Sequence, residues 1–330
     1  LEASLREQAL GNGHVETLAA VTALARLMMG QGKLGEATAL YRHALKESTG
    51  SVGADSPLTL RTMVSLAELL ADQMLTDEAA SLYRAALKGL EATMGPQHPQ
   101  TLQTTDHLGM VLAEQGKRAL AASVFKKALD GYMKAYGPKH PETLGTMSNL
   151  ANALRLQGKL DAAVSYYQQA VKGLDAALGG SDREALRALH GLAATYAAQR
   201  KHADALPAYR KAYEGRVDCL GAAHPSTLHT LGELAASTLA VGRVQEAVAL
   251  HRQCVEGSSA TFGAQDEQTL LAVERLAHAL GKQGKHDEAE ALYRGVLDAL
   301  TLRDGERGER PRAVAQKLVD VLIAQAKLLE

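Results

Sequence analysis

The sequence has few of the residues that build redox, metal and membrane sites. Its 330 residues include two cysteines and no tryptophan, so no disulfide framework and no cysteine-based zinc site is expected. Lysine and arginine (36) balance aspartate and glutamate (37), which leaves no basic surplus for nucleic-acid phosphates. No apolar run approaches the roughly 18 residues that cross a bilayer, and no signal segment opens the chain. We therefore expect no nucleic-acid partner, no membrane insertion and an intracellular, cytoplasmic location.

The motifs of the common enzyme classes are missing as well. The chain contains no GxxxxGK[ST] or GxGxxG phosphate loop, no HExxH, no GxSxG and no CxxC. His98, His140 and His224 occupy equivalent positions of separate internal repeats, which is typical of helix caps rather than of one metal site. Cys254 stands where five other repeats have alanine, which predicts a buried, unreactive thiol. We expect no catalytic residue, no metal and no cofactor, and so a protein that is not an enzyme.

An internal repeat runs through the whole chain. The dipeptide Thr-Leu recurs with a 42-residue period, with its threonines at Thr17, Thr59, Thr101, Thr143, Thr227 and Thr269. Within residues 140 to 179, apolar side chains at steps of three and four outline two helices on either side of Gln157-Gly158-Lys159. Each unit is therefore predicted to be a helical hairpin, and no strand pattern competes.

Helix boundaries follow the same period. A glycine is predicted to end each second helix, because it adopts the left-handed conformation at little cost: Gly11, Gly53, Gly95, Gly137, Gly179, Gly221, Gly263 and Gly305. Three residues later stands a cap for the next helix: His14, Ser56, His98, His140, Asp182, His224 or Asp266. Aromatic rings are predicted to fill the core between repeats: Tyr41, Tyr83, Phe125, Tyr167, Tyr209 and Tyr293. Pro207 lies inside a second helix, where we expect a local irregularity.

The repeat also sets the domain organisation. We predict one repeat domain over 1–330, with the remnant of a second helix at 1–12 and seven helix pairs over 13–306. A terminal capping helix is expected at 307–330.

The order Leu-Ala, Gly, Ala, Tyr and Ala in each unit resembles the tetratricopeptide repeat, whose usual period is about 34 residues. Segments such as YGPKHPETL, SNLANALRLQGKL and EAEALYRGVL resemble the longer repeats of kinesin light chains and kinesin-light-chain-like proteins. The resemblance covers nearly the whole chain. It implies an all-α fold, a right-handed superhelical α-solenoid of stacked helical hairpins whose first helices line the concave side. It also implies a non-enzymatic scaffold that binds a peptide or protein segment in that groove.

The resemblance places a set of side chains in the groove. They are Arg26, Arg61, Glu68, Asp106, Asn149, Asn152, Arg155, Arg187, His190, His229, Glu274 and His278. Ser148, Asn152 and Arg155 share one helix face, and Arg187 faces the same way on the next first helix. Two guanidinium groups with an amide nearby suit a carboxylate, so we expect an acidic, extended segment as the partner. Alternatively, these side chains are solvated and have no dedicated ligand.

Two other functions remain alternatives. In the first alternative, the chain is the sensing or autoinhibitory arm of a larger signalling ATPase. The first residue, Leu1, is not methionine and residues 1–10 form a part-repeat, and both features are compatible with this alternative. Or it is a structural subunit of a fixed multiprotein assembly. Exposed apolar residues on an unpaired end helix, such as Leu318, Val321 and Leu322, would favour the second alternative.

Overall fold

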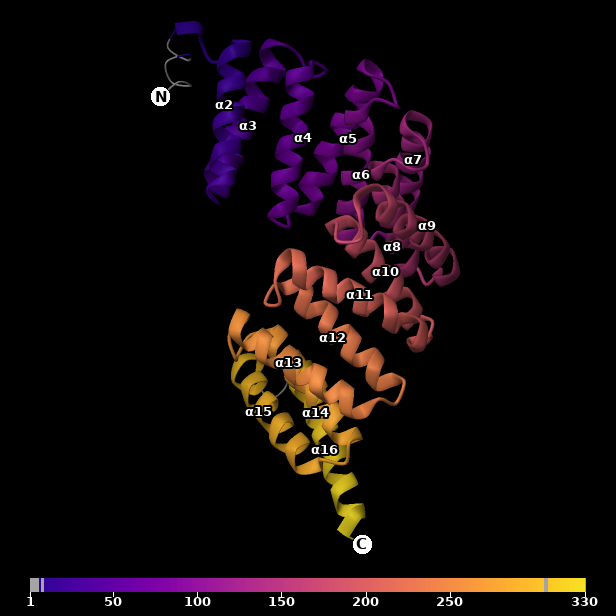
Figure 1. Ribbon diagram of the computed structural model, residues 1–330. Coiled ribbons are helices and arrows are strands. Elements are labelled where there is room, and N and C mark those ends of the chain that lie inside the picture. The colour runs from indigo at the N-terminus through magenta and orange to yellow at the C-terminus, as the bar shows by residue number, and fades with distance from the viewer. Residues whose placement is uncertain (1–5, 7–8, 306–307, 330) are drawn as a thin grey trace. The chain divides into compact units, whose positions relative to one another are not determined.

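The computed structural model describes residues 6, 9–305 and 308–329, all of whose regular structure is helical (Figure 1). The first four hairpins pair α2 (Val15–Gly30) with α3 (Leu34–Ser51), α4 (Pro57–Asp72) with α5 (Thr76–Thr93), α6 (Pro99–Glu114) with α7 (Arg118–Tyr136), and α8 (Pro141–Leu156) with α9 (Leu160–Leu178). The next three pair α10 (Arg183–Ala198) with α11 (His202–Leu220), α12 (Pro225–Ala240) with α13 (Val244–Phe262), and α14 (Glu267–Lys282) with α15 (His286–Asp304). A last helix, α16 (Glu309–Leu329), follows where the capping helix was predicted. Most of the expected helix remnant at 1–12 lies outside the described residues.

The chain forms two compact units, Leu1–Tyr166 and Tyr167–Glu330, with the boundary inside α9. The prediction of one domain over 1–330 stays a prediction. Within each unit a helix packs on the next one along the chain, and successive first helices also touch each other: α2 with α4, α4 with α6 and α6 with α8 in the first unit, and α10 with α12 and α12 with α14 in the second. The first helices therefore line the inner side of each stack.

The loop between repeats explains why threonine recurs with the period. Gly137 has φ 84°, and His140 accepts a hydrogen bond from the backbone N–H of Glu142 at 3.3 Å. The hydroxyl of Thr143 then donates to the carbonyl of Gly137 at 2.8 Å, which closes the loop. All eight predicted glycines have positive φ, and all seven predicted caps accept a backbone hydrogen bond. At Thr269 the same buried hydroxyl has no hydrogen-bond partner.

The turn inside each hairpin contains a feature that the sequence analysis missed. Five of these turns hold a glycine with φ between 72° and 85°, namely Gly32, Gly116, Gly158, Gly242 and Gly284. In the other two hairpins Met74 (φ 63°) and Arg200 (φ 61°) occupy the same left-handed position. Side chains with a Cβ adopt this conformation at a cost, so both turns store strain.

The predicted aromatic core is confirmed. Each of the six rings is at most 3% exposed. The Tyr167 ring packs so closely on α10 that a Cβ at Gly191 would lie 2.4 Å from its Cζ. The seventh position of this register holds His251, which is 2% exposed. Around Pro207 the helix α11 continues without a break.

Candidate functional site

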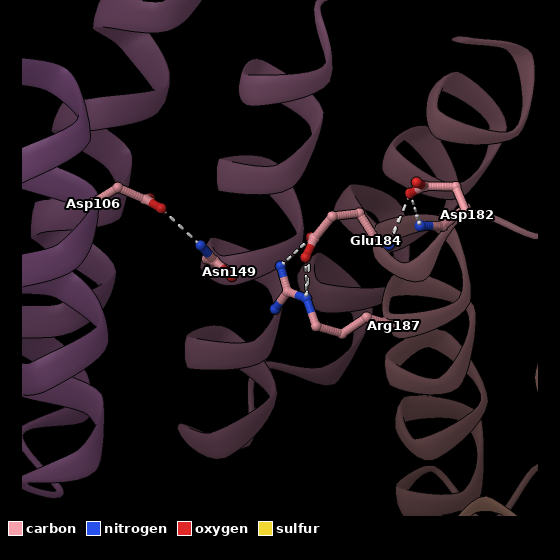
Figure 2. A network of polar contacts seen from close by, with 6 residues as sticks. Asp106, Asn149, Asp182, Glu184 and Arg187 are labelled. Carbon is pink, nitrogen blue, oxygen red and sulfur yellow. Dashed lines mark hydrogen bonds and ion pairs between the residues drawn. The ribbon is translucent and has the colours of Figure 1, made fainter. Parts of the chain in front are cut away.

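The inner side of the first unit presents a short run of polar side chains on α6 and α8. Asn149 Nδ2 donates to Asp106 Oδ2 of the preceding first helix at 2.9 Å (Figure 2). Arg155 Nη2 donates to Asn152 Oδ1 at 2.9 Å, so the structure brings together the predicted amide and guanidinium. Ser148 was expected on this face, but it is only 1% exposed because neighbouring helices cover it.

A partly exposed ion pair lies next to this run. His107 Nδ1 is 3.2 Å from Glu68 Oε1, and its ring meets the edge of Tyr83 at a centroid distance of 6.0 Å. Burial opposes protonation of His107, but Glu68 and more distant carboxylates outweigh it and raise the histidine pKa. Arg26 on α2 and Arg61 on α4 are exposed in the same unit.

In the second unit, Arg187 is engaged by its own helix. Its Nη2 lies 2.6 Å and its Nε 3.1 Å from Glu184 Oε2 (Figure 2). The side chains of Arg187 and Glu184 are 43% and 48% exposed. Asp182 caps the same helix by accepting hydrogen bonds from the N–H groups of Glu184 and Ala185. Exposed ion pairs contribute about 0–1 kcal/mol, so a ligand carboxylate can take the place of Glu184 without much loss of stability.

The structure brings together His190 and His229, two of the residues expected in the groove of this unit. Their ring centroids are 5.2 Å apart, and His190 also meets the edge of Tyr209 at 5.4 Å. The sequence analysis missed Arg216, which is 8% exposed and donates to the Ser226 carbonyl at 2.9 Å. Burial lowers the pKa of Arg216. Three other hairpins have leucine at this register and the rest have serine or tyrosine, so a charge at an otherwise uncharged position was the available signal.

The second unit also contains a cavity of about 530 Å³ between α12, α13, α14 and α16. Its lining comprises Ala236, Leu239, Ala240, Gly242, Val244, His251, Glu274, Arg275, His278, Lys282 and Lys317. Of these residues, only Glu274 and His278 were predicted to face the groove. Burial, helped by Arg275 and His278, lowers the pKa of His251 to about 4, so this imidazole is neutral at pH 7.

No group of three or more His, Cys, Asp or Glu side chains in the described ranges is arranged to hold a metal ion. None of the helices in the described part of the chain is long and apolar enough to span a membrane. Cys254 is 6% exposed, as predicted, and burial raises its thiol pKa, whereas Cys219 is exposed.

These features define a class of protein: an all-α solenoid of tandem helical hairpins. Six overlapping stretches match the Tetratricopeptide repeat family, at residues 16–92, 58–134, 107–176, 142–218, 184–259 and 226–302. The chain therefore belongs to the tetratricopeptide repeat family. Its 42-residue unit makes it a member of the kinesin-light-chain-like type.

Solved structures support this assignment. The nearly identical TPR-like repeats of a Podosopora anserina protein assigned as a kinesin light chain are 26% identical to this chain, cover 64% of it and 99% of their own length, and superpose with a TM-score of 0.57. BtubC (BKLC) from P. vanneervenii is 16% identical over 76% of this chain and 94% of its own, with a TM-score of 0.56. The apo form of RapI is 14% identical over 88% of this chain and 99% of its own, with a TM-score of 0.65. The last two show the fold alone. A search of curated proteins found no match.

Tetratricopeptide repeats form a family of non-enzymatic interaction scaffolds, and protein–protein interaction is the general function that follows for this chain.

Proposed function

We propose that the inner faces of the two units, lined by the first helices, bind an extended segment of a partner protein, and that the chain has no catalytic activity and needs no cofactor. The observation that carries this proposal is the set of arginine and amide side chains on these faces, which pair with neighbours on the same surface. Arg155 donates to Asn152 in the first unit, and Arg187 pairs with Glu184 in the second. A ligand can exchange for such contacts at low cost.

These arginines favour a partner segment that contains acidic residues. A guanidinium group binds a carboxylate through two parallel hydrogen bonds, as Arg187 already does with Glu184. Arg26 and Arg61 add exposed positive charge on the first helices of the first unit. We therefore propose an acidic, extended segment as the ligand, with each unit contributing its own surface.

Charge reversal on each unit separately tests the proposal. Affinity capture from the source cell would compare the unmodified chain with Arg155→Glu and with Arg187→Glu. The matched control is Arg84→Glu, since Arg84 is exposed on the second helix α5. We expect a partner that both the unmodified chain and the control retain and that at least one inner-face variant loses. A partner lost only with Arg84→Glu would place the contact on the outer side and contradict the proposal.

A structural subunit of a fixed assembly is a second candidate, favoured by the last helix. Leu318 is buried, and Val321 and Leu322 pack against the core of the last hairpin, so these expected contacts are already used. The same helix exposes Val319 (44%) and Ile323 (49%) instead. In this alternative, Ile323→Lys would release the chain from a complex that Arg155→Glu and Arg187→Glu leave intact, as measured by light scattering after size-exclusion chromatography.

The remaining alternative, a sensing arm of a larger signalling ATPase, is tested by the full-length gene, which would carry a phosphate-binding loop upstream. We also propose an intracellular, cytoplasmic location. Its support is that both cysteines are free thiols, which is typical of reducing compartments.

A further inference from the structure

The cavity of the second unit lies beside a departure from the aromatic register. In six hairpins a tyrosine or phenylalanine fills this position of the second helix, and each ring is buried. In α13 the position holds His251, whose five-membered ring is smaller. The small side chains of Ala236 and Ala240 on α12 leave the adjoining space open. The result is an apolar chamber of about 530 Å³, within the range of small-molecule sites.

Histidine at position 251 lowers the stability of the folded protein. His251 is 2% exposed, yet its Nδ1 atom has no hydrogen-bond partner. A buried polar atom without a partner destabilises the folded state, and a phenylalanine at the same position would carry no such atom. At this position His251 therefore stabilises the core less than the tyrosine or phenylalanine of the other repeats would.

The charges at the chamber favour an anion. Its lining holds three cations, Arg275, Lys282 and Lys317, and one carboxylate, Glu274. Lys317 pairs with Glu274, and Arg275 pairs with Glu233 at 3.0 Å. Lys282, by contrast, is exposed and makes no ion pair with a described residue. The walls below these charges are apolar and include Leu239 and Val244.

We propose that this chamber binds a small amphipathic anion: a free carboxylic acid with an aromatic or branched aliphatic body. The body lies against Leu239 and Val244 in the space that a tyrosine ring fills in other repeats. The carboxylate lies at the cationic side, where Lys282 supplies the charge that no carboxylate of the described chain offsets. The pocket includes Glu274 and His278 of the predicted groove, and it differs from the proposed recognition of a partner segment because it takes a free small molecule.

Titration of the whole chain with phenylacetate tests the proposal, with phenylacetamide as the neutral analogue and phenethylamine as the cationic one. Isothermal titration calorimetry and the thermal unfolding midpoint would be measured for the unmodified chain and three variants. His251→Tyr fills the chamber with the ring found in other repeats. Lys282→Gln removes the charge, and Lys88→Gln is the matched control on α5, where Lys88 is exposed in the first unit.

We expect phenylacetate to bind and raise the unfolding midpoint, phenylacetamide to bind about tenfold more weakly, and phenethylamine not to bind. His251→Tyr should abolish binding while keeping the helical circular dichroism spectrum and raising the midpoint of the free protein. Lys282→Gln should weaken phenylacetate about tenfold and leave phenylacetamide unchanged, and Lys88→Gln should change neither. The proposal is overturned by any of three results: no phenylacetate binding to the unmodified chain, equal affinity for acid and amide, or undiminished binding to His251→Tyr.

Discussion

Replacing Met74 and Arg200 by glycine is expected to stabilise the protein, one site in each compact unit. Both residues have φ near 60°, where the other five hairpin turns place glycine. For a residue with a Cβ, the left-handed conformation costs about 1–2 kcal/mol. Glycine also makes the unfolded chain more flexible, which offsets about 0.4–1 kcal/mol of the gain. The difference between these two effects is a net stabilisation of about 0.5–1 kcal/mol per site.

The side chains of Met74 and Arg200 make few contacts, so replacing them by glycine removes little stabilisation. Met74 is 73% exposed, and Arg200 is exposed and makes no ion pair with a described residue. Because the two sites lie in different hairpins and share no contact partner, their effects should add.

Urea and thermal unfolding of the full chain, followed by circular dichroism, measure the effect. For a unit of this size a change of about 1 kcal/mol shifts Tm by about 2–4 °C, so each glycine should raise the transition of its own unit by about 1–4 °C. Amide hydrogen exchange in the turn and the first turn of the following helix assigns the change to the correct hairpin. Gly158→Met is the reciprocal control and should destabilise by a similar amount. If both glycine variants are neutral or less stable while Gly158→Met is harmless, the strain argument is wrong.

Three further predictions concern buried groups. Thr143→Val should lower the free energy of unfolding by about 1 kcal/mol, because it removes the hydrogen bond to the loop carbonyl. Thr269→Val should be neutral or stabilising, since that hydroxyl has no partner. The urea unfolding midpoints of the two variants test this difference. Gly191→Ala should destabilise the protein by about 1–3 kcal/mol, because the new Cβ would lie 2.4 Å from a tyrosine ring. Gly281→Ala should stabilise it by about 0.5–1 kcal/mol through helix propensity, since the nearest neighbour of its Cβ would be 3.9 Å away. Equal effects of the two substitutions would contradict the packing argument. As pH falls from 6.5 to 4, His251 should cost the second unit about 3 kcal/mol, because it takes up a proton in the unfolded chain near pH 6.5 but in the folded chain only near pH 4. Burial also lowers the pKa of His229 and of His278, so unfolding midpoints across this window should show a loss that His251→Tyr reduces but does not abolish.

Most of the fold could be predicted from the sequence because a repeat reports each structural requirement several times. A helix cap, a stop glycine and a core ring recur with the repeat, and each has a local physical cause that one copy suffices to identify. The same logic would have revealed the strain at Met74 and Arg200, since glycine fills that position in the other turns. A single copy, Gln157-Gly158-Lys159, does not show that the position recurs in every hairpin.

The side-chain contacts of the candidate site were less predictable. Arg187 pairs with Glu184 three residues earlier on its own helix, a spacing that could have been recognised. The hydrogen bond from Asn149 to Asp106 depends on how successive first helices pack, which periodicity alone does not determine. Neither did periodicity show that Ser148 is covered by its neighbours.

Departures from the repeat are the most informative features of this chain. In a solenoid each hairpin has nearly the same structural task, so a residue that serves packing alone should match its register. Among the hairpins, Arg216 is the one charged residue at a register of leucine, serine and tyrosine, His251 stands at an aromatic register, and both are buried in adjacent hairpins of the second unit. A buried polar atom without a partner reduces stability, as at His251 Nδ1, whereas Arg216 donates to the Ser226 carbonyl and to the Thr230 hydroxyl. The second unit is therefore where ligand binding should first be sought, and substitutions that restore the register there should raise stability as they reduce binding.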